Sequence, residues 1–162
     1  MVISVGDRLP EATLLTIGAN GPEAVELGEK LKGRKVVIFG LPGAFTGTCT
    51  TAHVPSFIRT KPKFDEKGVD EVICLTVNDP FVVKAWTDAT GAADAGIVTL
   101  ADAESAFTAA IGMEFSAPAV GFVNRSKRYS LYAEDGVVKV FNLEVARGGC
   151  EISAGETLLG QI

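Results

Sequence analysis

The sequence has few of the residue patterns that define metal or dithiol sites. It contains one histidine, His53, and three cysteines with no CxxC pair, so neither a closed zinc site nor a dithiol oxidoreductase is expected. The cysteines, Cys49, Cys74 and Cys150, are odd in number and widely spaced, which argues against a secreted disulfide scaffold. What remains is a set of buried structural thiols, a reactive thiol, or a mixture of the two.

Net charge and hydropathy argue against further classes of protein. The formal net charge is −5, which argues against nucleic acid or an anionic membrane as the main partner. No apolar run approaches the ~20 residues that a membrane-spanning helix needs, and the first residues lack the basic and apolar regions of a signal peptide. We therefore expect no membrane partner, and either a cytoplasmic protein or an organellar one from which a transit sequence has been removed.

Composition favours a single globular domain over residues 1–162, since 47% of the residues are apolar and 22% are charged. Residues 6–31 are expected to form turns and short strands. Further strands are predicted at 35–40, 69–77, 97–100, 118–123, 128–133 and 137–143, and helices at 50–60, 80–90, 102–112 and from 153 onward. Because helices alternate with the early strands and a hairpin comes late, we predict an α/β fold with a mixed sheet and helices on both faces.

Helix starts are marked by capping residues. Thr46 or Thr48 can cap the helix that follows the first confident strand, and Pro55 should kink it. Asp79, followed by a proline, is a strong start for the next helix. Ser153 and Glu156 have the spacing of a capping box, which predicts a short C-terminal helix.

One loop has the pattern of a reactive cysteine. Residues 41–49, LPGAFTGTC, follow a buried apolar run and place Cys49 at the start of a helix, where free N–H groups and the helix dipole favour the thiolate. Full ionisation of the Cys49 thiol would raise its reactivity only roughly 30-fold over that of an ordinary cysteine at neutral pH. A faster reaction therefore needs a fixed donor and a cation. Thr46 lies in the same turn, and the cation candidates, Arg125 and Arg128, lie far along the chain.

His53 lies four residues after Cys49 and would share a face of an unbroken helix with it. A Cys/His nucleophile pair is therefore conceivable. We favour a packing or hydrogen-bonding role, because a neutral imidazole adds no charge that would hold a thiolate.

The segment 42–49, PGAFTGTC, resembles the active-site signature of peroxiredoxins, P-x-x-x-T-x-x-C. Similarity to the type II/type 5 branch extends to the segments HVP at 53–55, VNDPF at 77–81, LAD at 100–102 and RSKRY at 125–129, and to Trp86. The resemblance covers almost the whole chain in order. It implies a thioredoxin-like fold and a thiol peroxidase that needs no metal, haem or flavin cofactor.

By that resemblance, Cys49 is the peroxidatic nucleophile, which attacks the terminal oxygen of a hydroperoxide and becomes a sulfenic acid. Thr46 hydrogen-bonds the peroxide, and Pro42 shields the thiol from water. Arg128 matches the catalytic arginine, which favours the thiolate and stabilises charge on the departing oxygen. Arg125 is a candidate supporting residue.

One loop residue departs from the family pattern, and the identity of the resolving cysteine is open. Gly47 stands where the family usually has proline, which predicts a more flexible loop. The resolving thiol could be Cys74, which matches one position used by relatives, or Cys150, which lies about two residues before another. Relatives that lack a usable second cysteine are resolved by glutathione or glutaredoxin.

The resemblance implies reduction of hydrogen peroxide and small organic hydroperoxides by a homodimer. Electrons would return from thioredoxin, glutaredoxin or glutathione. The alternative is a peroxide-sensing redox switch or holdase on the same scaffold, in which Cys49 is oxidised once and does not turn over.

Overall fold

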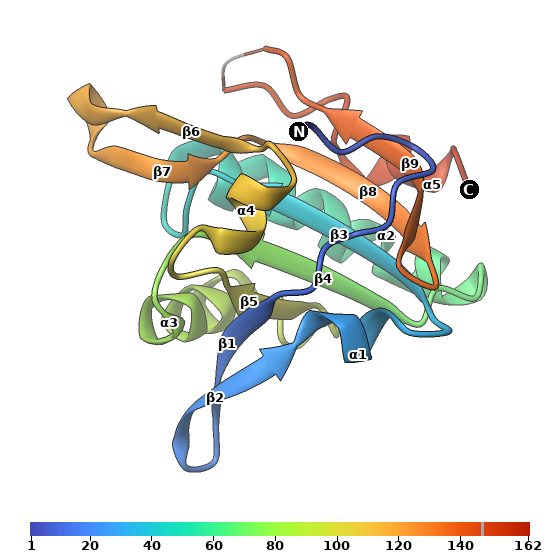
Figure 1. Cartoon of the computed structure of the whole chain (residues 1–162), viewed down its shortest axis with the longest axis horizontal. Coiled ribbons are helices and arrows are strands. Elements are labelled where there is room, and N and C mark those ends of the chain that lie inside the picture. The colour runs from blue at the N-terminus through green and yellow to red at the C-terminus, as the bar shows by residue number, and fades with distance from the viewer. Residues whose placement is uncertain (147) are drawn as a thin grey trace.

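The computed structural model describes residues 1–146 and 148–162, and its centre is a seven-stranded mixed sheet with helices on both faces (Figure 1). The strand order is β2-β1-β5-β4-β3-β8-β9. The strands of this sheet are β1 (Thr13–Gly18), β2 (Gly21–Glu26), β3 (Lys35–Leu41), β4 (Glu71–Thr76), β5 (Val98–Ala101), β8 (Tyr129–Glu134) and β9 (Val137–Leu143). The helices are α1 (Leu27–Leu31), the π-helix η1 (Cys49–His53), α2 (Val54–Glu66), α3 (Pro80–Thr90), α4 (Ala106–Ala110) and α5 (Gly155–Leu159).

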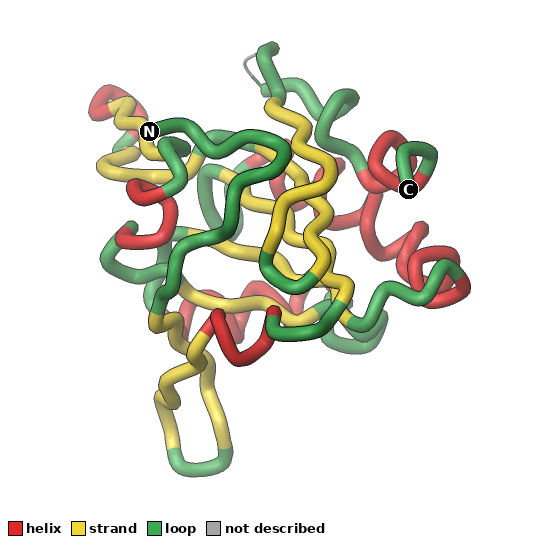
Figure 2. The backbone as a smooth tube through the Cα atoms, turned by 45° about the vertical axis from the view of Figure 1, so that its right-hand side comes forward, coloured by secondary structure: helices red, strands yellow, loops and turns green. Residues whose placement is uncertain are grey.

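The three central strands β3, β4 and β5 run parallel. β1 and β8 pair antiparallel to β5 and β3, and each forms an antiparallel pair with the edge strand beside it, β2 or β9. β3 and β4 are buried almost throughout, which explains their continuous apolar sequence. At the outer edge, the hairpin of β1 and β2 extends away from the body of the molecule (Figure 2).

Two apolar cores lie on opposite faces of the sheet. On one face, α2, α3 and α5 contribute Phe57, Trp86 and Leu158 to a core that also holds Cys49 and Cys74. On the other face, α1 and α4 pack against the remaining sheet side chains in a second core. The predicted mixed sheet with helices on both faces is confirmed.

The predicted strand at 118–123 is wrong. Residues Pro118–Val120 form a 3-10 turn, η2, which separates β6 (Glu114–Ala117) from β7 (Phe122–Ser126). Pro118 has no N–H to donate to a ladder, and Gly121 adopts a φ of 81°, so the chain turns at this point. β6 and β7 pair only with each other and form a separate two-stranded arm (Figure 1).

Two of the predicted helix caps are wrong. The hydroxyl of Thr46 donates to the Gly43 carbonyl (2.7 Å) and that of Thr48 to the Gly148 carbonyl (2.9 Å), so neither caps the helix. Ser153 and Glu156 do not form a capping box, because their side chains bond to Glu144 and Arg59 instead.

The remaining helix predictions have clearer outcomes. Asp79 caps α3 as predicted, accepting the N–H of Val82 at 2.9 Å. Pro55 lies in the first turn of α2, where the π-helical turn η1 gives way to α-helix. Where a kink was expected, the structure has a change of helix type between His53 and Val54, next to a proline that has no N–H to donate.

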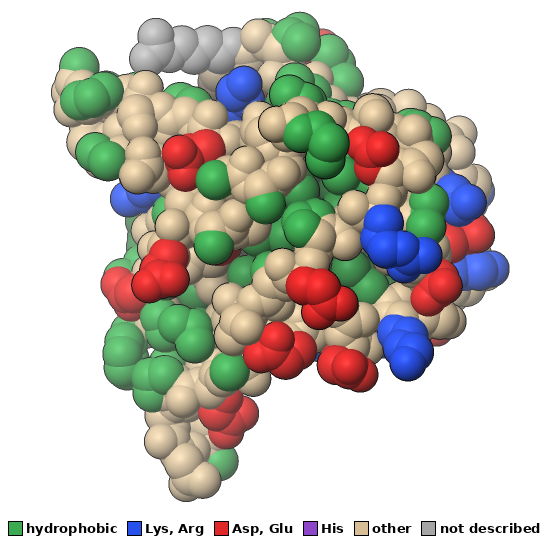
Figure 3. Space-filling view, viewed as in Figure 1, with side chains coloured by type: hydrophobic (Ala, Val, Ile, Leu, Met, Phe, Trp, Pro, Cys, Tyr) green, Lys and Arg blue, Asp and Glu red, His purple; other side chains and the backbone are tan. Residues whose placement is uncertain are grey.

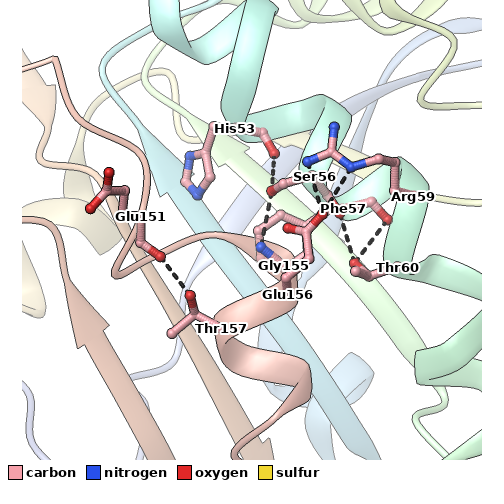
Figure 4. A network of polar contacts seen from close by, with 9 residues as sticks. All are labelled: His53, Ser56, Phe57, Arg59, Thr60, Glu151, Gly155, Glu156 and Thr157. Carbon is pink, nitrogen blue, oxygen red and sulfur yellow. Dashed lines mark hydrogen bonds and ion pairs between the residues drawn. The ribbon is translucent and has the colours of Figure 1, made fainter.

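The C-terminal helix α5 docks on α2 through Ser56 (Figure 4). The Ser56 hydroxyl accepts the N–H of Gly155 at 2.9 Å and donates to the His53 carbonyl at 2.7 Å. Gly155 has no room for a side chain, because a Cβ there would lie 2.5 Å from Thr60 Oγ1. This docking brings the C-terminal segment against the turn that contains Cys49 and His53.

Candidate active site

The cysteine loop leaves the carboxyl end of β3 and is anchored to the end of β4. Asn78 Oδ1 accepts the N–H of Ala44 (2.9 Å) and the hydroxyl of Thr76 (2.6 Å). Phe45 adopts a left-handed φ of 60° and is 59% exposed. The loop thus presents an apolar side chain outward while Cys49, at the start of η1, is 1% exposed.

Arg128 reaches Cys49 from a different part of the chain. Its Nη2 donates to Cys49 Sγ at 3.2 Å, and both side chains are buried. The strand register explains this contact. Gly40, near the end of β3, pairs with Tyr129 of β8, and Arg128 directly precedes Tyr129, so Arg128 lies beside the start of the cysteine loop. The guanidinium therefore places a permanent positive charge and a hydrogen-bond donor directly against the Cys49 sulfur.

His53 contacts Arg128 on its other side. His53 Nδ1 lies 3.1 Å from Arg128 Nη1, and Nε2 lies 3.1 Å from the Ser153 carbonyl oxygen. Because arginine can only donate, Nδ1 is the acceptor and Nε2 carries the hydrogen. Burial and the charge of Arg128 lower the pKa of His53 to about 3. The ring is therefore neutral at physiological pH, which agrees with a hydrogen-bonding role and not with an ion pair.

Arg125 holds the start of the loop. Its Nη1 donates to the Pro42 carbonyl at 3.0 Å, and its guanidinium lies over the Phe122 ring, 5.3 Å from the centroid. A side chain at Gly43 would come within 2.3 Å of Arg125 Nη1. Arg125 thereby connects the β6–β7 arm to Pro42.

Pro42, Thr46 and Arg128 line one open hollow of ≈ 370 Å³. Phe115 and Phe122 of the arm contribute apolar side chains to its lining. Because the Thr46 hydroxyl hydrogen is directed to Gly43, the Thr46 oxygen presents lone pairs rather than a donor.

Gly47 is exposed at the rim of this hollow, and a Cβ there would meet no atom within 4 Å. Its backbone does not occupy the left-handed region. The space at this position would therefore accommodate a side chain.

The other two cysteines are not ready nucleophiles. Cys74 lies inside the central strand β4, and burial, followed by the charge of Cys49, raises its pKa well above the ordinary value. Cys150 is half-buried, and burial is the main cause that raises its pKa to about 11. All three cysteines are free thiols.

Sequence reasoning did not single out two groups that complete the site. The Ser153 carbonyl accepts from His53, and Glu144 accepts hydrogen bonds from the segment that contains Ser153. No sequence signal identifies these pairings, because they join residues that lie 9 to 100 positions apart. Trp86, which belongs to the family resemblance, is buried and donates to Thr50 Oγ1 at 3.0 Å.

Over residues 1–146 and 148–162, no group of three or more histidine, cysteine, aspartate or glutamate side chains is placed to hold a metal ion. Within the same described residues, no helix has the length and apolar character needed to cross a membrane.

Comparison with known proteins gives consistent matches. The family described as Redoxin matches residues 4–159. Peroxiredoxin-2E-2, chloroplastic, from Oryza sativa subsp. japonica is 44% identical over 161 residues, covering 97% of this chain and 71% of the relative. Peroxiredoxin-2C from Arabidopsis thaliana is 37% identical over 158 residues, covering 97% of this chain and 96% of the relative.

Solved structures agree with the sequence relatives. The crystal structure of reduced Prx3 from Vibrio vulnificus in complex with H2O2 superposes with a TM-score of 0.91 at 38% identity, covering 99% of each chain. Peroxiredoxin 5 from Alvinella pompejana has a TM-score of 0.83 at 29% identity, covering 97% of this chain and 96% of that one.

Proposed function

Because this chain belongs to the Redoxin family, and within it to the peroxiredoxins, which are thiol peroxidases, we propose that Cys49 is its peroxidatic nucleophile and Arg128 its catalytic cation. The family, the thioredoxin-like α/β fold and the enzyme class are confirmed as predicted. The observation that carries the residue assignment is the 3.2 Å hydrogen bond from Arg128 Nη2 to Cys49 Sγ. The family match over residues 4–159 also supports treating 1–162 as one domain.

The reaction follows from this geometry. The Cys49 thiolate attacks the terminal oxygen of the hydroperoxide, the O–O bond breaks, and the sulfur becomes a sulfenic acid. The departing oxygen carries the negative charge until it takes a proton and leaves as water or an alcohol. Arg128, fixed beside the sulfur, stabilises that charge in the transition state.

Thr46 and Pro42 would orient the substrate and keep the site dry. The free lone pairs of Thr46 Oγ1 can accept the hydroxyl hydrogen of the peroxide, and Pro42 covers the site against water. The apolar side chains in the lining of the hollow support small organic hydroperoxides as substrates in addition to hydrogen peroxide.

A thiol reductant regenerates Cys49. We propose that an external thiol, from glutathione, glutaredoxin or thioredoxin, attacks the sulfenic acid before Cys74 or Cys150 can. Both internal thiols are protonated at neutral pH, and Cys74 lies within the central strand of the sheet.

We also propose a homodimer that buries apolar side chains around the loop. Phe45, Phe81, Val120 and Val123 are each about 60% exposed. Figure 3 shows apolar side chains on the β6–β7 arm, where the two valines belong to the turn and to β7. Relatives named as chloroplastic or mitochondrial, and others without such a label, support either an organelle or the cytoplasm as the compartment.

A turnover assay tests the proposed function. With excess peroxide, glutaredoxin and glutathione, the wild-type chain should consume peroxide continuously, and Cys49→Ser should abolish consumption. Cys150→Ser is the control and should retain turnover. Continued turnover by Cys49→Ser would end the residue assignment. A wild-type chain that is oxidised once and then stops would indicate a peroxide sensor instead.

A further inference from the structure

We propose that Glu144 is a positioning residue for Arg128, acting through the Ser153 carbonyl and the His53 ring to orient the guanidinium against Cys49. The inference rests on the proposed roles of Cys49 and Arg128. It identifies a carboxylate outside the recognised motif that connects the C-terminal part of the chain to the reacting sulfur.

The first step is the attachment of the segment of residues 148–154, which we call the Cys150 segment. Glu144 Oε2 accepts three hydrogen bonds from it: the N–H of Glu151 (3.0 Å), the N–H of Ser153 (3.0 Å) and the Ser153 hydroxyl (2.9 Å). Partial burial alone would raise the pKa of Glu144, but these hydrogen bonds outweigh burial and lower it. The carboxylate is therefore ionised at neutral pH, and its hydrogen bonds are charge-assisted.

The second step passes through Ser153 to His53. Ser153 is fully buried, and while its N–H and hydroxyl go to Glu144, its carbonyl accepts the Nε2 hydrogen of His53. The imidazole lies edge-on to Phe39 and Phe57, with ring centroids 5.0 and 5.6 Å away. A buried N–H without an acceptor is costly, so the ring orientation depends on where the Ser153 carbonyl lies.

The third step passes from His53 to the sulfur. The Nη1 of Arg128 donates to His53 Nδ1, and Nη2 donates to Cys49. The N–H of Glu144 also donates to the Arg128 carbonyl at 2.9 Å, so Glu144 contacts the backbone of the same arginine whose side chain it orients indirectly. Without this chain of bonds, Arg128 would keep its charge but lose the partner that fixes the direction of Nη2.

The test compares Glu144→Gln with a matched control, Glu156→Gln. Glu156 is a carboxylate of the same C-terminal part of the chain, but it is paired with Arg59 at the surface and lies outside the chain of bonds. The readout is the rate of Cys49 oxidation by hydrogen peroxide in a single turnover without reductant. We expect Glu144→Gln to be slower by about tenfold, as for a modest misplacement of a catalytic group, and Glu156→Gln to match the wild type.

The second readout is the nitrogen NMR spectrum of the imidazole. His53 is the sole histidine of the chain, so its ring signals need no assignment. The wild type should show the Nε2-protonated form with a slowly exchanging hydrogen, and Glu144→Gln should show faster exchange or mixed tautomers. A slower reaction with unchanged His53 signals would mean that Glu144 affects only stability, which would overturn the proposal.

Further outcomes distinguish a failure of the role proposed for Glu144 from a failure of the roles proposed for Cys49 and Arg128. A folded Glu144→Gln chain with wild-type rate and wild-type His53 signals would overturn the inference alone. A wild-type chain whose Cys49 is not oxidised by peroxide would refute the proposed function instead. If Glu144→Gln fails to fold, Glu144→Asp keeps the charge but shortens its reach, and the same two measurements on it decide the question.

Discussion

Arg128 uses the two ends of its guanidinium on two different partners. One nitrogen donates to the Cys49 sulfur and the other to His53, and the side chain is almost fully buried. Only a planar, forked cation can make both contacts from a single position. The site therefore depends on arginine at this position and not on positive charge alone.

Arg128→Lys should accordingly slow Cys49 oxidation by about 100-fold, because a single ammonium cannot replace both donors. Arg125→Lys is the matched control. Arg125 donates one hydrogen bond to the Pro42 carbonyl, which an ammonium can also make, so a change of only a few-fold is expected. Stopped-flow measurement of the oxidation rate checks both, and equal slowing of the two variants would show that Arg128 has no special role.

His53 should make the folded state sensitive to acid. Its pKa is about 3 in the folded chain, below the ordinary 6.5, so the unfolded chain binds a proton that the folded chain does not. Its stabilising effect is complete above pH 6.5 and is lost as the pH falls toward 3, by up to about 1.4 kcal/mol per pH unit. Urea unfolding at pH 7, 6 and 5 should show a steeper loss for the wild type than for His53→Gln. Parallel losses in the two proteins would contradict this prediction.

The short helix α5 affects the site through the place where it docks. It has five residues, yet its first residue bonds to Ser56 and the preceding Ser153 bonds to His53. The close approach of α5 to α2 is possible because position 155 has no side chain. The docking of this helix therefore contributes to the geometry around Arg128.

Gly155→Ala should destabilise the chain by about 1–3 kcal/mol, because the new methyl group would overlap Thr60 Oγ1 and the Ser56 carbonyl. It should also slow Cys49 oxidation, since Ser153 would move with α5. Gly160→Ala is the control, because a Cβ there lies 3.6 Å from its nearest neighbour. Thermal unfolding and the single-turnover rate measure the two effects. Wild-type values for Gly155→Ala would show that the contact is easily relieved.

On the scale of the whole molecule, the fold decides whether Cys74 or Cys150 can reach oxidised Cys49 and form a disulfide with it. Cys74 lies in β4, which pairs with β3 on one side and β5 on the other, so it cannot move without opening the centre of the sheet. Cys150 belongs to a segment that Glu144 holds in place. An internal disulfide therefore requires Cys49 or the Cys150 segment to leave its position.

Mass spectrometry after one equivalent of peroxide should accordingly detect Cys49 mainly as a sulfenic acid, or as a mixed disulfide once glutathione is added. Cys74→Ser and Cys150→Ser should leave turnover with glutathione and glutaredoxin unchanged. A dominant Cys49–Cys74 or Cys49–Cys150 bond that forms faster than glutathione reacts would contradict this prediction.

Part of this protein could be derived from the sequence by itself. The alternating strand and helix pattern predicted the α/β class, and the segment 42–49 predicted the family and Cys49 as the candidate reactive cysteine. These inferences succeed because apolar periodicity and loop residues act over a few positions of the chain. The β6–β7 arm was missed because a short turn, Pro118–Val120, interrupted what looked like one strand.

Only the tertiary structure shows how residues distant in the chain reach the sulfur and which partners hold them there. The register that pairs Gly40 with Tyr129 brings Arg128 to Cys49, and the docking of α5 brings Ser153 to His53. These contacts join residues 75 to 100 positions apart. Hydrogen bonds between such distant residues leave no local pattern in the sequence, because each partner is chosen by the packing of the whole sheet and its helices.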